Sequence, residues 1–400
     1  MSQAPLRLVH ITTIPSTLRF LHGQASYVQA QGFEVHAISS PDPALADFGD
    51  HEGVAVHGVE MTRSITPLRD LAAFLRLWRL LRSLRPQLVE AHTPKAGLFG
   101  VLCARLARVP VRIYLMHGLI STAVGRSRRI RQRWLARLVE KLSCWQATEV
   151  ICVSPSVREE AIRAGLVAAD RIKVLVNGSV NGVDAAGRFN PDRLSEEVRR
   201  ATRARHGIPL DALVLGFVGW IVRDKGLVEL TEAWQWVKQE YPALHLLLVG
   251  PVGKEDPLPA SVIDVLQDDA RVHLTGLDLD TPPLYAAMDL FVLPTYREGF
   301  PVVSLEAAAM GLPVVSTRVP GCVDAIQDGI TGTLVPVQDA AALADAIRRY
   351  LDSPELRQAH GQAARARVLR DFRPEAIWEA KLAEYLRLLP APLRTVEGGR

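Results

Sequence analysis

Short apolar runs typical of buried β-strands alternate with helical segments along the whole chain, and this alternation constrains the fold most. Before residue 180 the runs read LRLVHIT, FEVHAIS, VAVHGVE, QLVEAHT, VRIYLMH, EVICVS and IKVLVNG. After a polar stretch the pattern begins again with LVLGFVG, LHLLLVG, VHLTG, LFVLPT, PVVST and TGTLVP. Strands separated by helices form parallel sheets with helices on both faces. The sequence therefore predicts an α/β protein of two doubly wound, Rossmann-like domains facing across a cleft.

The boundary between the two predicted domains lies in a polar segment. Residues 185–207 are rich in Gly, Pro and charged residues and lack an apolar period. We expect residues 1–190 to form the first domain and residues 191–373 the second, with a helix at about 374–390 returning to the first. Neither half has a G-x-G-x-x-G after its first strand, which disfavours a dinucleotide-binding dehydrogenase.

Composition excludes several classes of protein. With 400 residues, 48% of them hydrophobic, the chain can bury two cores. Its four cysteines show no Cys-x-x-Cys spacing, so neither a zinc site nor a disulfide framework is indicated and a reducing compartment is expected. The amino terminus lacks the apolar core of a signal peptide. No apolar run approaches the ~20 residues of a membrane-spanning helix, so we expect a cytoplasmic protein that is not integral to a membrane.

Positive charge is concentrated in the first half. Residues 1–190 contain 24 Lys and Arg against 14 Asp and Glu, a net charge of +10, whereas the remainder has 23 against 29, a net charge of −6. A basic half suits nucleic acid, an anionic lipid surface or a phosphorylated small molecule. Nucleic acid is the weakest of the three, because the sequence has no RNP-like, zinc-finger or helix-turn-helix signature.

Two glutamates, Glu298 and Glu306, stand eight residues apart in REGFPVVSLEAAAMGL. The same spacing recurs elsewhere, as between Glu232 and Glu240 in an amphipathic helical segment, so the surroundings must decide. Around Glu298, LFVLPT reads as a buried strand, YREGFP as a turn and VVSLEAAAMGL as a helix ending at Gly311. The pair therefore lies at the carboxyl end of a strand, where open α/β sheets bind ligands.

Three strand-end loops in the second half carry candidate ligand-binding groups. In VRDKG, Arg223 and Lys225 precede a helix, where cations oppose the helix dipole unless an anion binds beside them. Two exposed surface cations are the alternative. Thr275 ends another strand, in a loop that either reads a base edge through main-chain groups or is an ordinary turn. After Phe300 and Pro301, the N–H groups of a helix start can hold a phosphate.

Several motifs resemble the family 4 retaining glycosyltransferases, which have the GT-B fold. They are EGFPVVSLEAAAMGLPVV, GCVDAIQDGITGTLVP, VRDKG, LMHG and NGVD, and they span nearly the whole chain. TTIPSTLRFLHGQ and AHTPKAGLFG further resemble a capsule and exopolysaccharide subgroup. The resemblance implies transfer of a sugar, an N-acetylhexosamine foremost, from a UDP-sugar to an undecaprenyl-diphosphate-linked saccharide.

The resemblance also implies roles for individual residues. Glu306 would bind the ribose hydroxyls of the nucleotide, and Glu298 the hydroxyls of the transferred sugar. Lys225 and Arg223 would neutralise the diphosphate, and His117 would face the reacting sugar. His117, Lys225 and Glu298 are therefore the predicted catalytic residues. The other predicted donor-binding residues are Thr275, Gly299, Phe300, Pro301, Val302 and Val303.

Two positions depart from the family pattern. After the strand LVLGFVG, where many members have Arg, this chain has Trp220, and we expect Arg223 to replace the missing cation. The amino-terminal loop reads IPST and lacks the usual Gly-Gly pair. Ser16 of this loop and Lys95 of HTPKAG are the predicted acceptor-binding residues.

No metal or other cofactor is expected. Asp278 and Asp280 match the spacing of a metal-binding Asp-x-Asp motif, but they lie in the predicted base-reading loop. Breaking the bond from sugar to phosphate develops negative charge on the diphosphate, which Lys225 would stabilise in place of a metal ion. Two alternatives remain open: a nucleotide-sugar epimerase of the same fold and a non-catalytic scaffold that binds sugar nucleotides.

Two helical segments predict binding to the inner face of an anionic membrane. In GRSRRIRQRWLARLVEKLSCW the apolar residues follow one helical stripe with basic residues around it, and LRDLAAFLRLWRLLRSLRP repeats the combination. Basic residues near an anionic surface contribute about 1 kcal/mol each. The alternative is that both helices pack on their sheet and expose a solvated basic face. The predicted membrane-facing residues are Arg128, Arg129, Arg131, Arg133 and Trp134.

Overall fold

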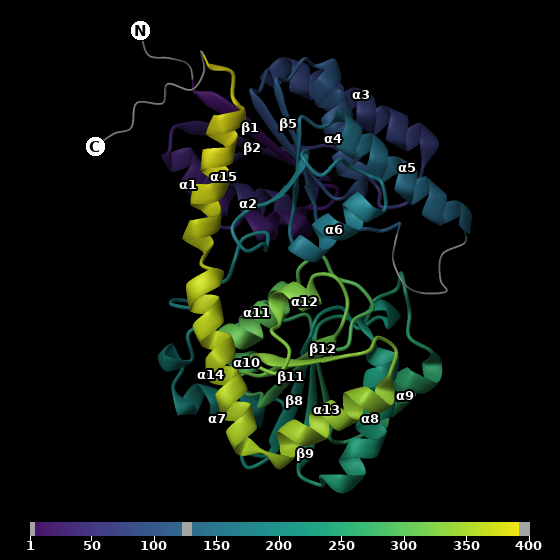
Figure 1. Ribbon diagram of the computed structural model, residues 1–400, viewed down its shortest axis with the longest axis vertical. Helices are drawn as coiled ribbons and strands as arrows, with labels where there is room; N and C mark the ends of the chain where they lie inside the picture. The colour runs from purple at the N-terminus through teal and green to yellow at the C-terminus, as the bar shows by residue number, and fades with distance from the viewer. Residues whose placement is uncertain (1–4, 122–129, 392–400) are drawn as a thin grey trace. The chain divides into compact units, whose positions relative to one another are not determined.

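The computed structural model describes residues 5–121 and 130–391, except for the side chains of 130–132. The chain separates into two compact units (Figure 1). Unit 1 contains the described residues up to 121, those from 130 to 181 and those from 374 onward, and unit 2 contains residues 182–373. Each unit is built on one sheet with helices packed against it. The prediction of two doubly wound α/β domains is confirmed.

Unit 1 contains a seven-stranded sheet in which all neighbouring strands are parallel. Its central strands are buried almost completely, which is why they read as continuous apolar runs. The strand order is β3-β2-β1-β4-β5-β6-β7. The bounds are β1 Leu6–Ile11, β2 Phe33–Ser39, β3 Ala55–Gly58, β4 Leu88–His92, β5 Val111–Met116, β6 Glu149–Cys152 and β7 Ile172–Val174.

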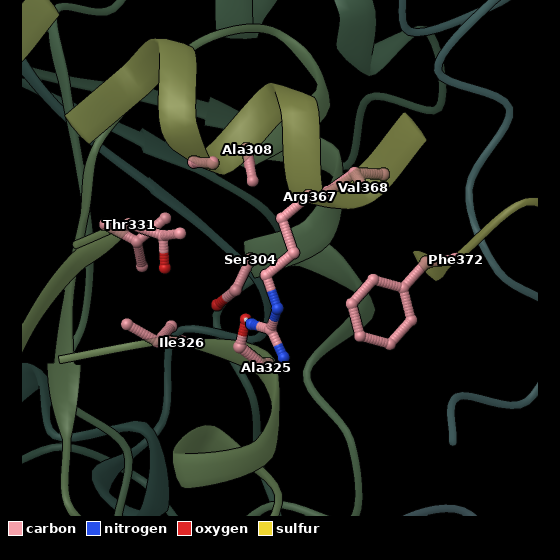
Figure 2. A pocket seen from close by; sticks show the side chains of 10 residues that line it. Ser304, Ala308, Ala325, Ile326, Thr331, Arg367, Val368 and Phe372 are labelled. Atoms are coloured by element: carbon pink, nitrogen blue, oxygen red, sulfur yellow. Dashed lines mark hydrogen bonds between the residues drawn. The ribbon is translucent and has the colours of Figure 1, made fainter. Parts of the chain in front are cut away.

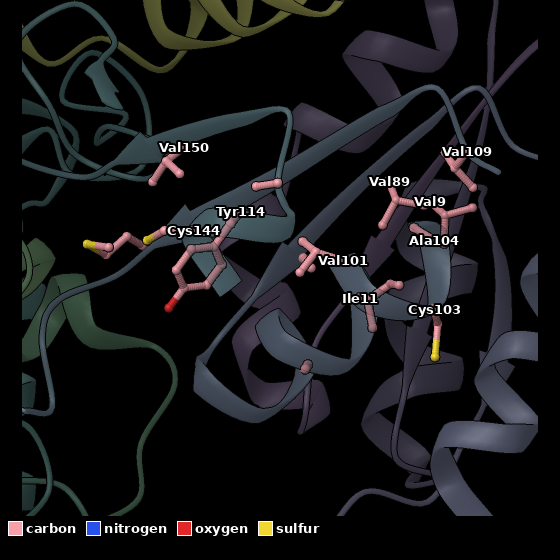
Figure 3. Packing of buried hydrophobic residues seen from close by; sticks show 14 of the residues in the cluster. Val9, Ile11, Val89, Val101, Cys103, Ala104, Val109, Tyr114, Cys144 and Val150 are labelled. Atoms are coloured by element: carbon pink, nitrogen blue, oxygen red, sulfur yellow. The ribbon is translucent and has the colours of Figure 1, made fainter. Parts of the chain in front are cut away.

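The helices of unit 1 cover both faces of this sheet. Helices α3 to α6 contribute to one apolar cluster with Val9 and Val89 (Figure 3). Successive strand residues face opposite sides, so Glu90 points to the other face, where it contacts Lys381 and Tyr385 of α15. The bounds are η1 Pro15–Leu21, α1 Gln24–Ala30, α2 Pro43–Glu52, α3 Pro67–Leu84, α4 Pro94–Leu106, α5 Ile130–Gln146, α6 Pro155–Arg163 and α15 Pro374–Leu388.

Unit 2 contains a six-stranded parallel sheet of order β10-β9-β8-β11-β12-β13. The winding reverses between β8 and β11, and ligands bind at such a switch point in open α/β sheets. The strands are β8 Leu213–Val218, β9 Leu244–Val249, β10 Val272–Gly276, β11 Leu290–Leu293, β12 Val314–Thr317 and β13 Gly332–Val335. The helices are η2 Pro191–Arg193, α7 Glu196–Arg205, η3 Arg223–Lys225, α8 Leu227–Glu240, α9 Ala260–Asp268, α10 Thr281–Ala286, α11 Val302–Ala309, α12 Cys322–Ala325, α13 Ala340–Asp352 and α14 Pro354–Asp371.

The division between the units falls after Asn181 rather than at the predicted residue 190. Residues 182–190 belong to unit 2, because Val183 donates its N–H to the carbonyl of Phe372 and Arg365 donates to two backbone carbonyls of this segment. Asn181 itself bonds to groups of unit 1. Backbone carbonyls accept hydrogen bonds whatever the residue, so composition did not reveal this attachment.

Candidate functional site

The loop after β8 carries Arg223 and Lys225 in the short 3-10 turn η3. Gly226 ends this turn with a φ of 74° and begins α8. A Cβ at position 226 would lie 1.9 Å from the carbonyl oxygen of Pro294, just beyond β11. Only glycine allows this approach, so the backbone fixes Lys225 beside the loop that follows β11.

Two ion pairs join the loops that follow β8 and β11. Lys225 Nζ lies 2.5 Å from Glu298 Oε1, and these side chains are 26% and 13% exposed. Arg297 Nε lies 2.5 Å from Asp224 Oδ2. The structure thus brings together two of the three residues predicted to be catalytic. Sequence reasoning missed Asp224 and Arg297, although each is the immediate neighbour of a predicted residue.

The turn that follows Glu298 is fixed by close packing. Gly321 has a φ of 78°, and a Cβ there would lie 2.4 Å from the carbonyl oxygen of Gly299. The loop before α12 therefore rests directly on this turn. Phe300 is buried, with its ring centroid 5.4 Å from that of Phe372. These contacts hold the backbone between Glu298 and α11 in one conformation.

Helix α11 begins immediately after this turn and has no side-chain cap. Pro301 is its N-cap residue and has no side-chain oxygen to accept from the first N–H groups. The N–H groups of Val302 and Val303 begin the helix. Uncapped N–H groups and the helix dipole together favour an anion at this position.

Glu306 lies four residues after the start of α11, about one helical turn along. Tyr285 of α10 donates its hydroxyl to Glu306 Oε2 at 2.8 Å. Burial raises the pKa of Glu306 to about 7, although the Tyr285 hydrogen bond and the charge of Arg188 oppose this rise. At neutral pH this carboxyl group is poised between its charged and neutral forms.

Three further positions lie on the surface of unit 2. Thr275 is at the carboxyl end of the edge strand β10, where its hydroxyl donates to the carbonyl of Gly276. Trp220 is 53% exposed. Arg223 is exposed in the same turn as Lys225. Among the described residues, no hydrogen bond joins Thr275 to the Lys225–Glu298 pair, because β9 separates β10 from β8.

A small cavity lies beneath α11 rather than at the strand ends (Figure 2). Its volume is about 10 Å³, and Ser304, Arg367 and Phe372 are among its lining residues. A single water molecule needs about 10–15 Å³, so a nucleotide does not fit there. The groups suited to an anionic ligand lie instead at the ends of β8 and β11.

Unit 1 carries the third predicted catalytic residue, His117, directly after β5. Its Nε2 lies 3.1 Å from Nδ1 of His92. Burial lowers the pKa of His117 to about 4; the charge of Lys381 adds to this and that of Glu90 opposes it. The imidazole is therefore neutral at pH 7 and has one donor and one acceptor nitrogen.

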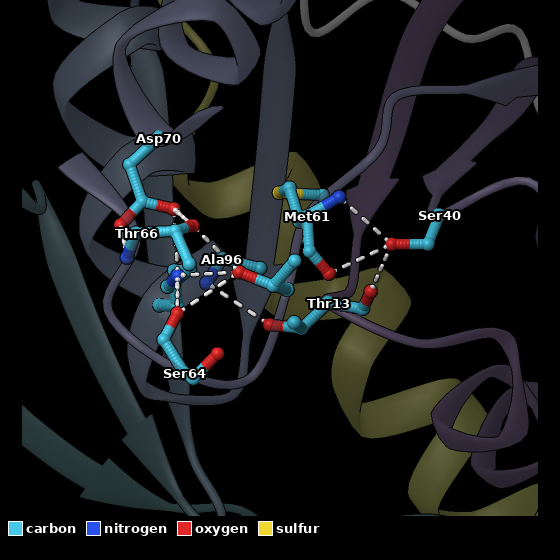
Figure 4. A network of polar contacts seen from close by, with 9 residues as sticks. Thr13, Ser40, Met61, Ser64, Thr66, Asp70 and Ala96 are labelled. Carbon is cyan, nitrogen blue, oxygen red and sulfur yellow. Dashed lines mark hydrogen bonds and ion pairs between the residues drawn. The ribbon is translucent and has the colours of Figure 1, made fainter. Parts of the chain in front are cut away.

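Lys95, a predicted acceptor-binding residue, is paired with a carboxylate. Its Nζ lies 2.7 Å from Asp70 Oδ1 and 2.5 Å from the carbonyl oxygen of Ser64. Thr66 donates its N–H and its hydroxyl to the same Asp70 (Figure 4). The ammonium group is therefore neutralised in this structure, and its contact with an acceptor stays a prediction. Ser16, the other predicted acceptor-binding residue, is exposed in η1.

The predicted membrane-facing residues fall at the start of α5 and before it. Arg128 and Arg129 lie outside the described residues, as does the side chain of Arg131. Arg133 and Trp134 are both exposed, and Trp134 is 67% exposed. Among the helices that the structure describes, none is long and apolar enough to span a membrane.

Comparison with known proteins identifies the family. The model of a glycosyl transferase 4-like domain matches residues 18–178, and that of glycosyl transferases group 1 matches residues 212–353. The capsular polysaccharide biosynthesis glycosyltransferase CapM of Staphylococcus aureus is 31% identical over 93% of this chain and 95% of its own length. The chain belongs to glycosyltransferase family 4. The predicted resemblance of this glycosyltransferase to the capsule and exopolysaccharide subgroup is confirmed.

Other relatives of the glycosyltransferase have names that include their acceptors. UDP-Gal:alpha-D-GlcNAc-diphosphoundecaprenol alpha-1,3-galactosyltransferase of Escherichia coli is 24% identical, over 89% of this chain and 90% of its own. N,N'-diacetylbacillosaminyl-diphospho-undecaprenol alpha-1,3-N-acetylgalactosaminyltransferase of Campylobacter jejuni is 29% identical, over 76% of this chain and 78% of its own length. HepE of Anabaena, solved with UDP-glucose, has a TM-score of 0.80 at 21% identity over 96% of this chain and 100% of its own. This likeness confirms the GT-B fold.

Proposed function

We propose that this glycosyltransferase moves a sugar, an N-acetylhexosamine foremost, from a UDP-sugar to an undecaprenyl-diphosphate-linked saccharide, with retention of the anomeric configuration. The observation that carries the proposal is the Lys225–Glu298 pair beside the uncapped start of α11. A cation and helix N–H groups suit a diphosphate, and a carboxylate suits sugar hydroxyls. The names of the Escherichia coli and Campylobacter relatives support a lipid diphosphate acceptor.

Each polar group of the site has a counterpart in a UDP-sugar. In the proposal, Glu306 accepts hydrogen bonds from the ribose hydroxyls and Glu298 from hydroxyls of the transferred sugar. Lys225, with Arg223 beside it, and the first N–H groups of α11 bind the diphosphate. Lys225 and Glu298 form an ion pair. This pair holds each side chain near the position where it would contact the donor, so less conformational entropy is lost on binding.

The proposed chemistry follows from charge development. The bond from the anomeric carbon to the diphosphate oxygen breaks, and the acceptor oxygen bonds to the same face of that carbon. The acceptor's proton passes to the departing phosphate oxygen, so no protein nucleophile takes part. Negative charge grows on the diphosphate, and Lys225 is preorganised to stabilise it in the transition state. His117 contacts the reacting sugar.

The function is tested by incubating the purified protein with a panel of UDP-sugars and a bacterial lipid extract. Mass spectrometry of the lipid fraction is expected to show the addition of one sugar residue from one of the donors. NMR of the product then gives its anomeric configuration, which tests retention. Conversion of the donor to an epimer, or binding of UDP-sugars without any product, would contradict the proposal.

Activity is expected to persist in excess EDTA. In the proposed mechanism, Lys225 and the N–H groups of α11 supply the positive charge that a divalent metal ion would otherwise supply. The initial rate in EDTA should stay within about two-fold of the rate in magnesium, because the stabilising charges belong to the protein. Abolition of turnover by EDTA with recovery in magnesium would show that the charge assignment is wrong.

We also propose that unit 1 binds the inner face of an anionic membrane, where such an acceptor would lie. On α5, Trp134 and Leu138 are 67% and 53% exposed, and Leu68 of α3 is 85% exposed. Glu140 does not lie on this exposed surface, because it is buried and accepts hydrogen bonds from Ile120 and Ser121. The exposed cations on these helices include Arg76, Arg79 and Lys141.

Reversing the charge of Arg76, Arg79 and Lys141 to glutamate is expected to weaken vesicle binding at least about 100-fold, since each cation contributes about 1 kcal/mol. Co-sedimentation with vesicles of varied anionic lipid content and salt measures this. The matched control reverses three exposed cations of unit 2, Arg193, Arg200 and Arg205, and should leave binding unchanged. Wild-type protein that ignores anionic lipid, or equal losses in both variants, would contradict the membrane proposal.

A further inference from the structure

Three histidines form a hydrogen-bonded chain that ends at His117. His10 Nδ1 lies 3.3 Å from His92 Nε2, and His92 Nδ1 lies 3.1 Å from His117 Nε2. His10 and His92 are both 1% exposed, whereas His117 is half-buried. Any influence of the two buried rings on a substrate must therefore pass through His117.

Strand register places these rings together. Glu90 and His92 are two residues apart on β4, so they point to the same face of the sheet. His10 on β1 is the register partner of Glu90. The intervening Ala91 points to the opposite face and belongs to the apolar cluster. These polar side chains therefore lie side by side across β1, β4 and the end of β5, on the face of the sheet that α15 covers.

Glu90 is a fully buried carboxylate with two strong donors. Lys381 Nζ lies 2.7 Å from its Oε1, and Tyr385 Oη lies 2.6 Å from its Oε2. Although burial opposes ionisation, the charge and the hydrogen bond of Lys381 hold the pKa of Glu90 well below its usual range. His10, Glu90 and His92 are close enough to hold a metal ion, but Lys381 already supplies the positive charge there.

The charge of Glu90 decides which nitrogen of His92 carries the proton. Glu90 Oε1 lies 3.4 Å from His92 Nε2. An ionised carboxylate only accepts hydrogen bonds, so a bare Nε2 would face its lone pairs, whereas Nε2–H is attracted to it. Burial lowers the pKa of His92 well below its usual value, so the ring is neutral and its Nδ1 is bare.

A bare Nδ1 on His92 sets the state of the next ring. Because His117 Nε2 faces this acceptor, it must carry the proton, and the neutral His117 ring then has a bare Nδ1. The remaining atom of the chain, His10 Nε2, has no hydrogen-bond partner among the described residues. It is unsatisfied in either tautomer, so it does not distinguish between them.

We propose that Glu90 is a positioning residue that acts through His92 to present His117 Nδ1 as a hydrogen-bond acceptor for a substrate hydroxyl. A carbonyl or phosphate oxygen, which cannot donate, is a poor partner for His117 in this state. The proposal rests on the proposed contact between His117 and the reacting sugar. In this proposal Glu90, which is buried on the far side of His92, determines that the sugar contacts a hydrogen-bond acceptor on His117 and not a donor.

Long-range ¹H–¹⁵N NMR spectra of the full-length, histidine-labelled protein measure the tautomers directly. Spectra of His117→Asn and His92→Asn variants assign the two rings. In wild-type protein both His92 and His117 are expected to have a protonated Nε2 and a bare Nδ1. A protonated Nδ1 on His117 would overturn the proposal, and this measurement needs no variant of Glu90 to fold.

The variant Glu90→Gln with Lys381→Met removes both charges of the buried ion pair together, so that neither is left unpaired. A glutamine amide can donate to His92 Nε2 and so reverse the chain. We expect protonation of His117 Nδ1 and a kcat at least about ten-fold lower, because a functional histidine that loses the carboxylate fixing its tautomer presents the wrong nitrogen. Unchanged tautomers or an unchanged kcat in the folded variant would overturn the proposal.

Tyr385→Phe is the matched control, because it removes a donor from the other oxygen of Glu90 and leaves the histidine chain intact. It should keep the wild-type tautomers and a kcat within about two-fold of wild type, since a carboxylate still faces His92 Nε2. A shift in either would overturn the assignment to Glu90 Oε1. If the NMR spectra show the expected tautomers but the protein transfers no sugar from any UDP-sugar, the proposed function is contradicted and the tautomer assignment is not.

Discussion

Replacing Lys225 by alanine is expected to lower kcat about 10²–10³-fold, because removing one preorganised charge from a transition state costs about 2.7–4 kcal/mol. The fold should stay intact, since Lys225 is 26% exposed and its ion pair with Glu298 is partly solvated. Pairs of this kind contribute about 0–1 kcal/mol to stability. Initial rates at saturating UDP-sugar and lipid acceptor, together with thermal unfolding, measure both effects.

Glu232→Ala is the control for this prediction. Glu232 belongs to a glutamate pair with the same eight-residue spacing, but it lies exposed on α8, so its loss should be nearly silent. A second test combines Lys225→Ala with Glu298→Ala. Because these side chains touch, their effects should not be additive. A near-normal kcat for Lys225→Ala, or simple additivity in the double variant, would remove the pair from the proposed site.

The fold could be predicted because its main signal is local. LFVLPT is apolar at every strand position, which only a strand buried on both faces requires, and it forms β11 Leu290–Leu293. The predicted helix end at Gly311 is confirmed: α11 ends at Ala309, and Gly311 has a φ of 79°. A left-handed glycine just beyond the last turn is a common helix stop. Lys225 and Glu298 could also be predicted from a local signal, because each lies in a loop that directly follows an apolar strand run.

The partners of polar residues could not be predicted, because they depend on which strands are neighbours. Lys95 seemed available to an acceptor, but Asp70, 25 positions away on α3, binds it. The charge network around Glu90 depends on α15, which lies 291 positions away at Lys381. One signal was present in the sequence: Glu90 stands inside the strand run QLVEAHT, between the apolar residues Val89 and Ala91. A charged residue in such a strand needs a buried partner.

Replacing Glu306 by alanine is expected to lower kcat/KM about 10²–10⁴-fold, because hydrogen bonds to a charged group contribute about 1.5–3 kcal/mol each and a ribose offers two hydroxyls. The loss should appear mainly in KM for the donor, since the ribose lies away from the reacting bond. Titration of the protein with UDP and steady-state kinetics measure it. A wild-type KM in the variant would exclude Glu306 from nucleotide binding.

The pH dependence gives a sharper test of the same carboxylate. Burial raises the pKa of Glu306 from 4.5 to about 7, so its contribution to stability is full below pH 4.5 and is lost as pH rises through 7. UDP affinity should change in the opposite direction and increase through pH 7, because the ionised carboxylate accepts stronger hydrogen bonds from the ribose hydroxyls than the protonated form does. Glu306→Gln should show neither trend. Because UDP is the ligand for both proteins, the titration of its own phosphate affects both profiles equally and drops out of the comparison.

Tyr285→Phe removes a hydrogen bond that favours the charged form of Glu306, so the midpoint of the pH profile should move to higher pH in this variant. Equal pH profiles in wild type and Glu306→Gln would contradict this role.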